Sequence, residues 1–331
     1  MTVVFRWAVA CGMASGMVAI GASGQAPPPQ SGADPVAAVR DFGASVRDPL
    51  EGEAAIARKK EHCSADAPRL ASIGRAVGQQ VRITRRGGES GLFTVAQAHE
   101  GGPEAVVGIG RLGRLRIGPG EGFEATVSPD VTHSHLTDAE AKAQGDFVER
   151  LDDDGTNTGL LIMAPHGGEM EVPTDLQAER VAELLGGKRT SVWRCRGYGV
   201  RGGKSAFARW HITSTETSEA SFPLLAKVSG RKFEHAVSFH GMVNKRILVG
   251  GTGPTRLKVE IRDAIRDAIA DPSIPVDLAL PGETNGGTTP TNIVNRYTQA
   301  GGIQIEQAPE ARRKYWKQIA EAVANVYRDK L

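Results

Sequence analysis

Three short apolar runs of the sequence each end in a residue that can bind a metal ion or move a proton. His166, His240 and Glu306 follow runs that read GLLIMA, HAVSF and GIQI. Zinc binds imidazole nitrogen and carboxylate oxygen, and a catalytic zinc site combines three protein ligands with an open position for water. Two histidines and one glutamate therefore match the composition of a catalytic zinc site. The alternative for each residue alone is a polar side chain at the end of a strand.

The histidine of the first run is followed by two glycines and two carboxylates. Gly167-Gly168 comes directly after His166, and Glu169 and Glu171 come next. Glycine beside a ligand lets the backbone turn sharply and leaves room for a substrate. Either carboxylate is close enough along the chain to share a metal ion with His166.

The elements that must position these residues alternate between strands and helices. The strand candidates are 159–164, 191–196, 207–213, 235–239, 246–249, 276–280 and 302–306, and the helix candidates are 174–185, 255–270 and 309–328. This alternation predicts an α/β domain over 136–331, with a mixed or largely parallel sheet flanked by helices. Ligands of such sheets bind at the carboxyl ends of the strands, where the three apolar runs end.

Two helix starts carry a capping-box pattern. Thr137 with Glu140 and Thr174 with Gln177 each place a hydroxyl three residues before a glutamate or glutamine. In a capping box these side chains satisfy backbone N–H groups at the helix start. We therefore expect helices to begin after both threonines.

The N-terminal region, 46–135, has a different character. Residues 46–78 carry broken helical patterns, whereas about 80–130 alternates β-branched runs with glycine turns. The alternation predicts a small β-rich subdomain placed before the α/β domain.

The first residues have the layout of a secretory signal peptide. Residues 1–26 combine an early arginine, an apolar stretch and small residues near a cleavage point, and the apolar stretch is short for a membrane anchor. Residues 27–45 are rich in Pro, Ser and Gly and are predicted to be a disordered linker. Export predicts a secreted or periplasmic protein. Cys63 and Cys195 remain in the mature chain, and either a disulfide or two free thiols fits.

Several separate motifs resemble the poly-γ-glutamate hydrolase family, whose related sequences were once labelled phage replication proteins. The motifs are APHGGEMEVPTDLQA, WHITSTETSEASF, VSFHG, ILVGG and NIVNRYTQAGGIQIE, in this order over about 155–328. The family is a zinc-dependent relative of the metallocarboxypeptidases. The resemblance implies a metallocarboxypeptidase-like fold and Zn²⁺ as the cofactor. It does not clearly cover 80–130.

The resemblance also implies roles for individual residues. The family motif HGGGIE matches 166–171, which makes His166 and Glu171 metal ligands, and VSFHG adds His240. Glu169 stands where the family usually has glycine, and its distance from His166 is the His-x-x-Glu spacing of metallocarboxypeptidases. Glu169 and Glu171 therefore remain alternatives for the carboxylate ligand of the metal, with Glu171 favoured. Glu306 matches the family's glutamate that resembles the general base of the metallocarboxypeptidases. Such a base takes a proton from the zinc-activated water and passes it to the leaving amine.

A polyanionic substrate calls for groups that bind carboxylates. Arg246 and Arg296 are candidates because guanidinium binds carboxylate through two hydrogen bonds, and Asn292 adds donors. His211 is a further pocket candidate, as a substrate or second-layer group, and a buried structural histidine is the alternative. For Arg246, Arg296 and Asn292 the alternative is a structural or surface role.

These features predict an exported zinc-dependent hydrolase of γ-glutamyl amide bonds that acts on anionic polyglutamate or a similar peptide. One alternative is a zinc amidase or carboxypeptidase acting on cell-wall peptides, and another is a non-catalytic module that binds an anionic polymer. The net charge of +2 and the 5% aromatic content argue against nucleic acid or a stable membrane partner. The oligomeric state is left open.

Overall fold

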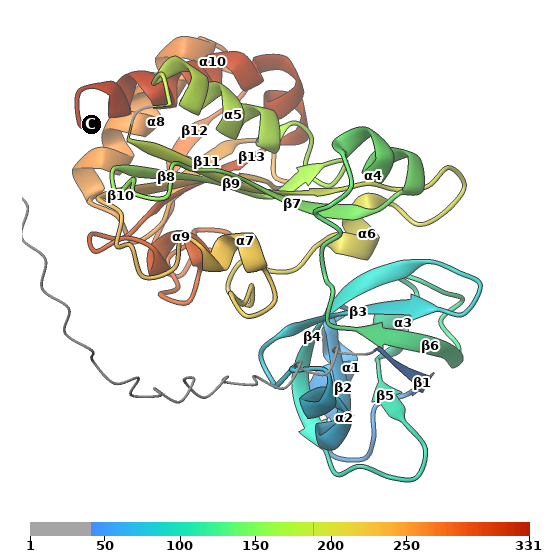
Figure 1. The fold of residues 1–331 in the computed structure, drawn as a ribbon. Helices are drawn as coiled ribbons and strands as arrows, with labels where there is room; N and C mark the ends of the chain where they lie inside the picture. Colours follow the sequence, from blue (N-terminus) through green and yellow to red (C-terminus); the bar gives the residue numbers. More distant parts are fainter. Residues whose placement is uncertain (1–40, 188) are drawn as a thin grey trace, which may run out of the picture. The chain divides into compact units, whose positions relative to one another are not determined.

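The computed structural model describes residues 41–187 and 189–331, which form a closed six-stranded barrel followed by an α/β domain with a seven-stranded sheet (Figure 1). The predicted signal peptide lies outside the described residues, as do residues 27–40 of the predicted linker.

The barrel has the strand order β1-β5-β2-β4-β3-β6. Its strands are β1 (Phe42–Arg47), β2 (His62–Asp66), β3 (Gln80–Arg85), β4 (Ser90–His99), β5 (Val106–Gly108) and β6 (Phe123–Ser128), with helices α1 (Ala54–Arg58), α2 (Ala67–Ser72) and α3 (Arg111–Arg114) between them. Alternate side chains fill the interior, for example Val81 and Ile83 of β3 and Val127 of β6, all of them buried. This alternation is the period-two pattern expected of strands that close around a core.

The β-rich region is longer than the sequence predicts. Strand β1 begins at Phe42, inside the predicted linker, and β2 lies within the stretch 46–78 that carries helical patterns. Strand β2 pairs in parallel with β4 and antiparallel with β5. Because these partners are distant in sequence, no local turn signal reveals the short strand HCSAD. The barrel therefore spans 42–128 rather than about 80–130.

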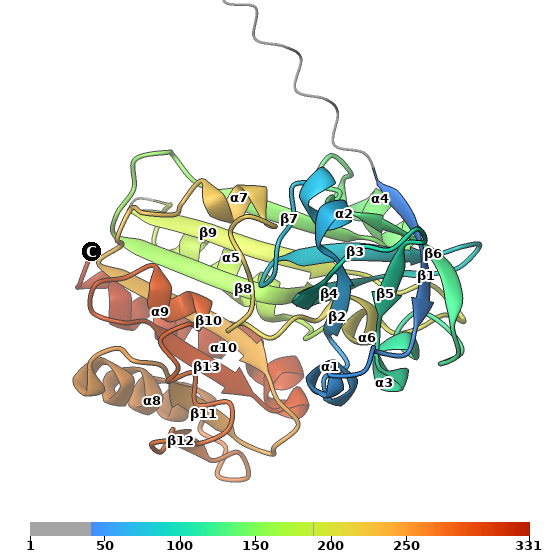
Figure 2. The same ribbon diagram turned by 90° about the horizontal axis from the view of Figure 1, so that it is seen from below.

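The α/β domain is built on a mixed sheet with the order β12-β11-β13-β10-β8-β9-β7 (Figure 2). Its strands are β7 (Phe147–Asp152), β8 (Leu160–Gly168), β9 (Thr190–Gly197), β10 (His235–Gly241), β11 (Ile247–Gly250), β12 (Val276–Leu278) and β13 (Ile303–Gln307). The central strands β13, β10, β8 and β9 run parallel, while β7 and β11 are antiparallel to their neighbours β9 and β13. The predicted α/β class with a mixed sheet is confirmed, although β7 was not predicted.

Helices cover both faces of this sheet. On one face lie α5 (Thr174–Leu184), α8 (Thr255–Ile269) and α10 (Pro309–Arg328), and on the other lie α6 (Ala206–Trp210), α7 (Pro223–Ala226) and α9 (Ile293–Arg296) (Figure 1). A further helix, α4 (Asp138–Gln144), precedes β7. Helices α5, α8 and α10 agree with the predicted ranges within one residue at each end.

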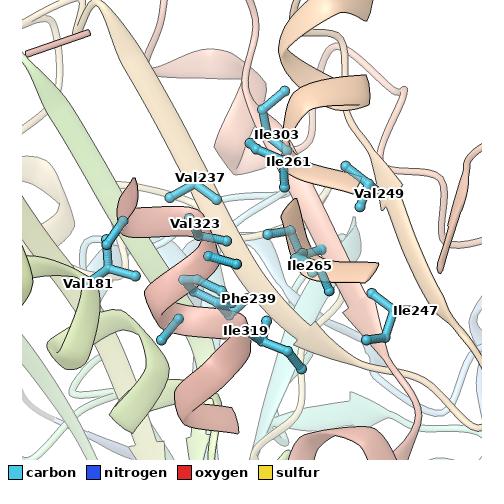
Figure 3. Close-up of a cluster of buried hydrophobic side chains, with 14 of the residues drawn as sticks. Val181, Val237, Phe239, Ile247, Val249, Ile261, Ile265, Ile303, Ile319 and Val323 are labelled. Atoms are coloured by element: carbon cyan, nitrogen blue, oxygen red, sulfur yellow. The ribbon is translucent and has the colours of Figure 1, made fainter. Parts of the chain in front are cut away.

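The main core lies between the sheet and the three longer helices (Figure 3). Ile261 and Ile265 of α8, Ile319 of α10, and Val237 and Phe239 of β10 are all fully buried. Burial of an aliphatic or aromatic side chain of this size stabilises the fold by about 1.5–3 kcal/mol. The apolar stripes at helical spacing thus hold the helices against the strands that carry the candidate site.

Two local predictions are wrong. The range 207–213 is not a strand, because the Ser205 hydroxyl accepts the N–H of Ala208 at 3.2 Å and starts helix α6, which buries Trp210. The capping box forms at Thr137 but not at Thr174, since α5 has no side-chain cap and its Gln177 pairs with Gln307 instead. The Gln177 amide donates to Gln307 Oε1 at 2.8 Å.

Candidate active site

His166 leaves the regular sheet at an irregularity near the end of β8. The parallel register of β8 and β9 shifts between Ala164 and Gly167, so His166 falls outside the regular ladder. Gly168 has a φ of +69°, and a Cβ at this position would lie 2.6 Å from the carbonyl oxygen of Gly197. Glycine is therefore required where the chain turns after the histidine.

Glu171 follows in the turn between β8 and α5. Its N–H donates to the carbonyl oxygen of His166 at 2.9 Å, and its Oε2 accepts the N–H of Gly241 at 2.8 Å. The same Oε2 lies 3.2 Å from His166 Nδ1. Glu169 instead accepts the N–H of Gly199 at 3.0 Å and is partly exposed. Of the two carboxylates that the sequence left as alternatives, Glu171 is the one that lies beside His166.

His240 and Glu306 come together through strand pairing. They are register partners on the parallel strands β10 and β13. Ser238, two residues before His240 on the same face of β10, has its Oγ 2.7 Å from His240 Nε2. This contact occupies Nε2, so the remaining nitrogen, Nδ1, is available to a ligand.

The Nδ1 atoms of His166 and His240 face each other. His166 Nε2 lies 2.9 Å from the carbonyl oxygen of Ile212, which can only accept, so Nε2 carries the proton. His166 Nδ1 lies 3.2 Å from His240 Nδ1. Two nitrogen lone pairs at this distance repel each other unless a proton or a cation lies between them. Glu171 Oε2, at 3.2 Å and 3.9 Å from the two nitrogens, completes a donor set that fits zinc.

Two of the three ligands already have the protonation state that binds a metal ion, whereas the third would exchange a proton for it. Burial alone would raise the pKa of Glu171, but the charge and hydrogen bond of His166 outweigh burial and lower it to about 2. Burial and the neighbouring His166 lower the pKa of His240 to about 3. A carboxylate that is ionised and an imidazole that is neutral at pH 7 are the forms that bind a metal ion. Burial alone would lower the pKa of His166, but the charge and hydrogen bond of Glu171 outweigh burial and raise it, so a metal ion would take the place of a proton on this ring.

Glu306 is held as a carboxyl group of unusually high pKa. Burial and the nearby charge of Glu171 raise the pKa of Glu306 well above its ordinary value. Gln304 Nε2 donates to Glu306 Oε1 at 2.9 Å, and Gln304 Oε1 accepts from Asn292 Nδ2 at 2.8 Å. A raised pKa brings a carboxylate closer to the pKa at which a general base is most effective at neutral pH.

His211 belongs to the same cluster. Its ring centroid lies 4.2 Å from that of His166, and one of its nitrogens is within 4.8 Å of donor atoms of both His166 and Glu171. Phe207 also stacks on the His211 ring, with the centroids 4.4 Å apart. His211 Nδ1 lies 2.5 Å from Oε1 of Glu61, a barrel residue that the sequence patterns did not single out.

These groups line one cavity of about 470 Å³. His166, Glu171, His240, Glu306 and His211 all contribute to its wall. Most of the remaining wall consists of Thr, Ser, Asn and Gly residues from 213–215 and 284–289. Among the described residues that line the cavity, none is a lysine or an arginine.

The predicted substrate arginines lie outside this cavity wall. Arg246 forms ion pairs with Asp277 and Glu283, and of these three residues only Glu283 lines the cavity. Arg296 donates to the carbonyl oxygen of Thr217 at 2.6 Å. The geometry therefore gives no support to a substrate role for either arginine in this cavity.

Asn292 does line the cavity, although its contacts are structural. Its side chain caps α9 by accepting the N–H of Val294 at 3.2 Å, and its amide holds Gln304. Asn292 thus supports Glu306 through Gln304.

The two described cysteines are not paired with each other. Cys63 is buried in the barrel and Cys195 is buried in the core of the α/β domain, and both are free thiols. Burial raises the pKa of both thiols. Of the two alternatives left by the sequence, the structure has free thiols.

The family follows from a match that covers more than half of the chain. Residues 134–329 match the family model described as poly-gamma-glutamate hydrolase. The chain belongs to the poly-γ-glutamate hydrolase family. The resemblance carried by the sequence motifs is confirmed, and the barrel of this family member lies outside the matched residues.

A curated relative of this poly-γ-glutamate hydrolase family member is the SPβ prophage-derived UPF0714 protein YoqZ of Bacillus subtilis (strain 168). The two are 30% identical over 169 residues, which is 50% of this chain and 55% of the relative. The match thus spans about half the length of the relative.

Solved structures with similarity include a bacteriophage poly-gamma-glutamate hydrolase and a chain described as YNDL-apo (zinc-free). The first is 25% identical, and the match covers 55% of this chain and 89% of the bacteriophage chain with a TM-score of 0.43. The second is 22% identical, and the match covers 56% of this chain and 90% of the other with a TM-score of 0.44. A putative carboxypeptidase A from Shewanella denitrificans OS-217 is 12% identical over 88% of this chain and 90% of its own, with a TM-score of 0.37. The fold assignment itself rests on the strand order and register of the sheet.

Among the described residues, no helix combines the length and the apolar character needed to cross a membrane.

Proposed function

We propose that this protein is an exported, zinc-dependent hydrolase that cleaves γ-glutamyl amide bonds, as in poly-γ-glutamate. The observation that carries the proposal is the meeting of His166 Nδ1, His240 Nδ1 and Glu171 Oε2 beside Glu306 in one cavity. Membership of the poly-γ-glutamate hydrolase family supports the hydrolase class and the linkage.

Each residue of the cluster has a role in amide hydrolysis. His166, Glu171 and His240 hold the metal ion, which when bound activates water at neutral pH and polarises the amide carbonyl. Glu306 accepts a proton from the attacking water and delivers it to the leaving amine. The hydrogen bonds of Gly241 to Glu171 and of Ser238 to His240 keep both ligands oriented.

The cavity wall favours recognition through neutral donors. Thr215, Asn285 and Thr288 offer hydroxyl and amide groups, and the described wall residues include neither lysine nor arginine. This composition supports a second candidate substrate, an amide of lower negative charge such as a cell-wall peptide, cleaved by the same site.

The experiment that tests the proposal compares substrates and metal states. Mature protein, with zinc or after chelation, is incubated with poly-γ-glutamate and with wall peptides, and the released amines are measured. We expect cleavage of poly-γ-glutamate that disappears on chelation and returns with zinc. Cleavage of wall peptides alone selects the second substrate, and no cleavage of any amide contradicts the enzymatic assignment.

Export is tested separately. The first residues, 1–26, have the signal-peptide layout. N-terminal sequencing of the protein from the medium or periplasm should begin after residue 22 and no later than residue 27. A protein that keeps Met1 inside the cell contradicts this part of the proposal.

A further inference from the structure

A carboxylate of the barrel binds two residues of the active-site cavity wall, His211 and Thr213. Glu61 lies immediately before β2 and is 7% exposed. Its Oε1 is 2.5 Å from His211 Nδ1, and its Oε2 accepts from the N–H of Thr213 at 3.0 Å and from its hydroxyl at 2.9 Å. Both carboxylate oxygens are thus used by residues of the cavity wall.

A second buried barrel residue holds the backbone that carries His211. Arg116 donates to the carbonyl oxygens of Ala208 at 2.5 Å, Arg209 at 3.2 Å and His211 at 2.9 Å. These carbonyls lie at the C-terminal end of α6, where a helix leaves acceptors without intrahelical partners and where positive charge is favourable. Arg116 also donates to the carbonyl oxygen of Leu92 in β4 at 2.6 Å, which anchors it to the barrel.

The contact with Glu61 sets the tautomer of His211. The Thr213 N–H and hydroxyl already donate to the carboxylate, and an ionised carboxylate can only accept, so His211 Nδ1 must carry the proton. Nε2 is then the nitrogen left free, in a ring that lines the cavity next to His166. Phe207 packs against this ring and limits its rotation.

We propose that Glu61 is a positioning residue of the active site, which fixes the orientation and tautomer of His211 so that Nε2 faces the substrate. This proposal rests on the proposed function, because it takes a substrate to bind in the cavity. The tautomer of His211, however, can be measured in the protein alone. The barrel, outside the residues that match the family, then supplies part of the catalytic arrangement.

The substitution Glu61→Gln gives a sharp test because glutamine has one acceptor oxygen in place of two. The Thr213 N–H cannot change its role, whereas imidazole can move its proton between nitrogens. The glutamine oxygen should therefore accept from Thr213, and its NH₂ group should donate to His211 Nδ1. His211 would then carry its proton on Nε2.

A matched control lies on the same boundary between barrel and α/β domain. Glu216 Oε1 is 2.9 Å from Nε2 of the barrel residue His62 and 2.9 Å from Nζ of Lys59. Neither His62 nor Glu216 lines the active-site cavity. Glu216→Gln therefore perturbs a similar His–Glu contact without reaching the candidate site.

The measurements are the ¹⁵N shifts of the His211 ring in metal-free full-length protein, the affinity for Zn²⁺ alone, and kcat and KM of the zinc-loaded enzyme. For Glu61→Gln we expect the proton on Nε2, kcat lower by about 10–100-fold as for other groups that orient an active-site residue, and KM and zinc affinity within about threefold. In the presence of His211→Ala, Glu61→Gln should cause no further loss. Glu216→Gln should behave as wild type.

Three results would overturn the proposal. They are an unchanged His211 tautomer in Glu61→Gln, a loss of activity that adds to that of His211→Ala, or zinc binding weakened tenfold, which would make His211 a metal ligand. If wild-type protein cleaves no amide, the proposed function fails, while the ring shifts still decide whether Glu61 fixes His211.

Discussion

His240 and Glu306 occupy the same register position on the neighbouring parallel strands β10 and β13. Paired strands lie about 4.8 Å apart, so one register position brings a metal ligand and a base candidate together on one face of the sheet. The irregularity at the end of β8 adds His166, and the turn that follows adds Glu171. The candidate site is thus a product of strand pairing and one glycine-dependent turn.

Glu306→Gln should separate proton transfer from metal binding. We expect hydrolysis to fall by about 10²–10⁴-fold because the amide cannot accept a proton from water. Zinc binding should persist, because Glu306 is not among the three ligands. The control is Glu169→Gln, which changes a partly exposed carboxylate bonded to Gly199 and should keep both activity and zinc. Loss of zinc in Glu306→Gln, or of activity in Glu169→Gln, contradicts these assignments.

Gly168→Ala should destabilise the protein at the turn that follows His166. The backbone has φ of +69° there, and the new Cβ would lie 2.6 Å from the carbonyl oxygen of Gly197. We expect a loss of about 1–3 kcal/mol in the free energy of unfolding of the metal-free protein. Urea unfolding measures it, with Gly43→Ala as the control because a Cβ at Gly43 meets nothing within 4 Å. Equal stabilities of the two variants would show that the turn tolerates a side chain.

Glu61 should make the stability of the protein depend on pH in the acid range. Burial raises the pKa of Glu61, but the hydrogen bond and charge of His211 outweigh burial and lower it from 4.5 to about 2. A depressed carboxyl pKa stabilises the folded state above pH 4.5, and this contribution disappears as pH falls through about 2. The contribution amounts to about 3 kcal/mol at most. Urea unfolding of metal-free wild type and Glu61→Gln should show a difference that shrinks over this range, and a constant difference would contradict it.

The arginines and Asn292 should differ in their effect on catalysis. Arg246→Met and Arg296→Met should each change kcat/KM by less than about threefold, because neither side chain lines the cavity. Asn292→Ala should lower kcat by roughly tenfold, because Gln304 would lose the partner that helps it hold Glu306. Steady-state kinetics on a γ-glutamyl substrate checks this order. A larger effect of either arginine would restore the predicted substrate role.

Local patterns were sufficient for much of the α/β domain. Apolar runs and helical stripes located β8, β10 and β13 and the helices α5, α8 and α10, and the strand ends pointed to His166, His240 and Glu306. These features are visible in sequence because burial imposes a period of two or 3.6 residues. The segment 207–213 fits both periods, so only the Ser205 cap and the contacts of Arg116 decide for a helix.

Contacts between distant parts of the chain could not be predicted from the sequence. Glu61 and His211 are 150 residues apart, and Glu61 stands in the charged stretch RKKEHC, which has the composition of a solvated surface. The same limitation hid β1 and β2, whose partners are long-range. The choice between Glu169 and Glu171 also needed coordinates, since both spacings suit a metal ion and only the turn after Gly168 decides which carboxylate faces His166.

The most direct measurement is the zinc content and zinc affinity of purified mature protein, beside His166→Ala, His240→Ala and Glu171→Gln. The three-ligand site predicts one zinc per chain in the wild type and loss of that zinc, with loss of hydrolysis, in each variant, while circular dichroism shows that the variants remain folded. One tightly held zinc that survives all three substitutions, or a fully active wild-type protein without metal, would contradict the site.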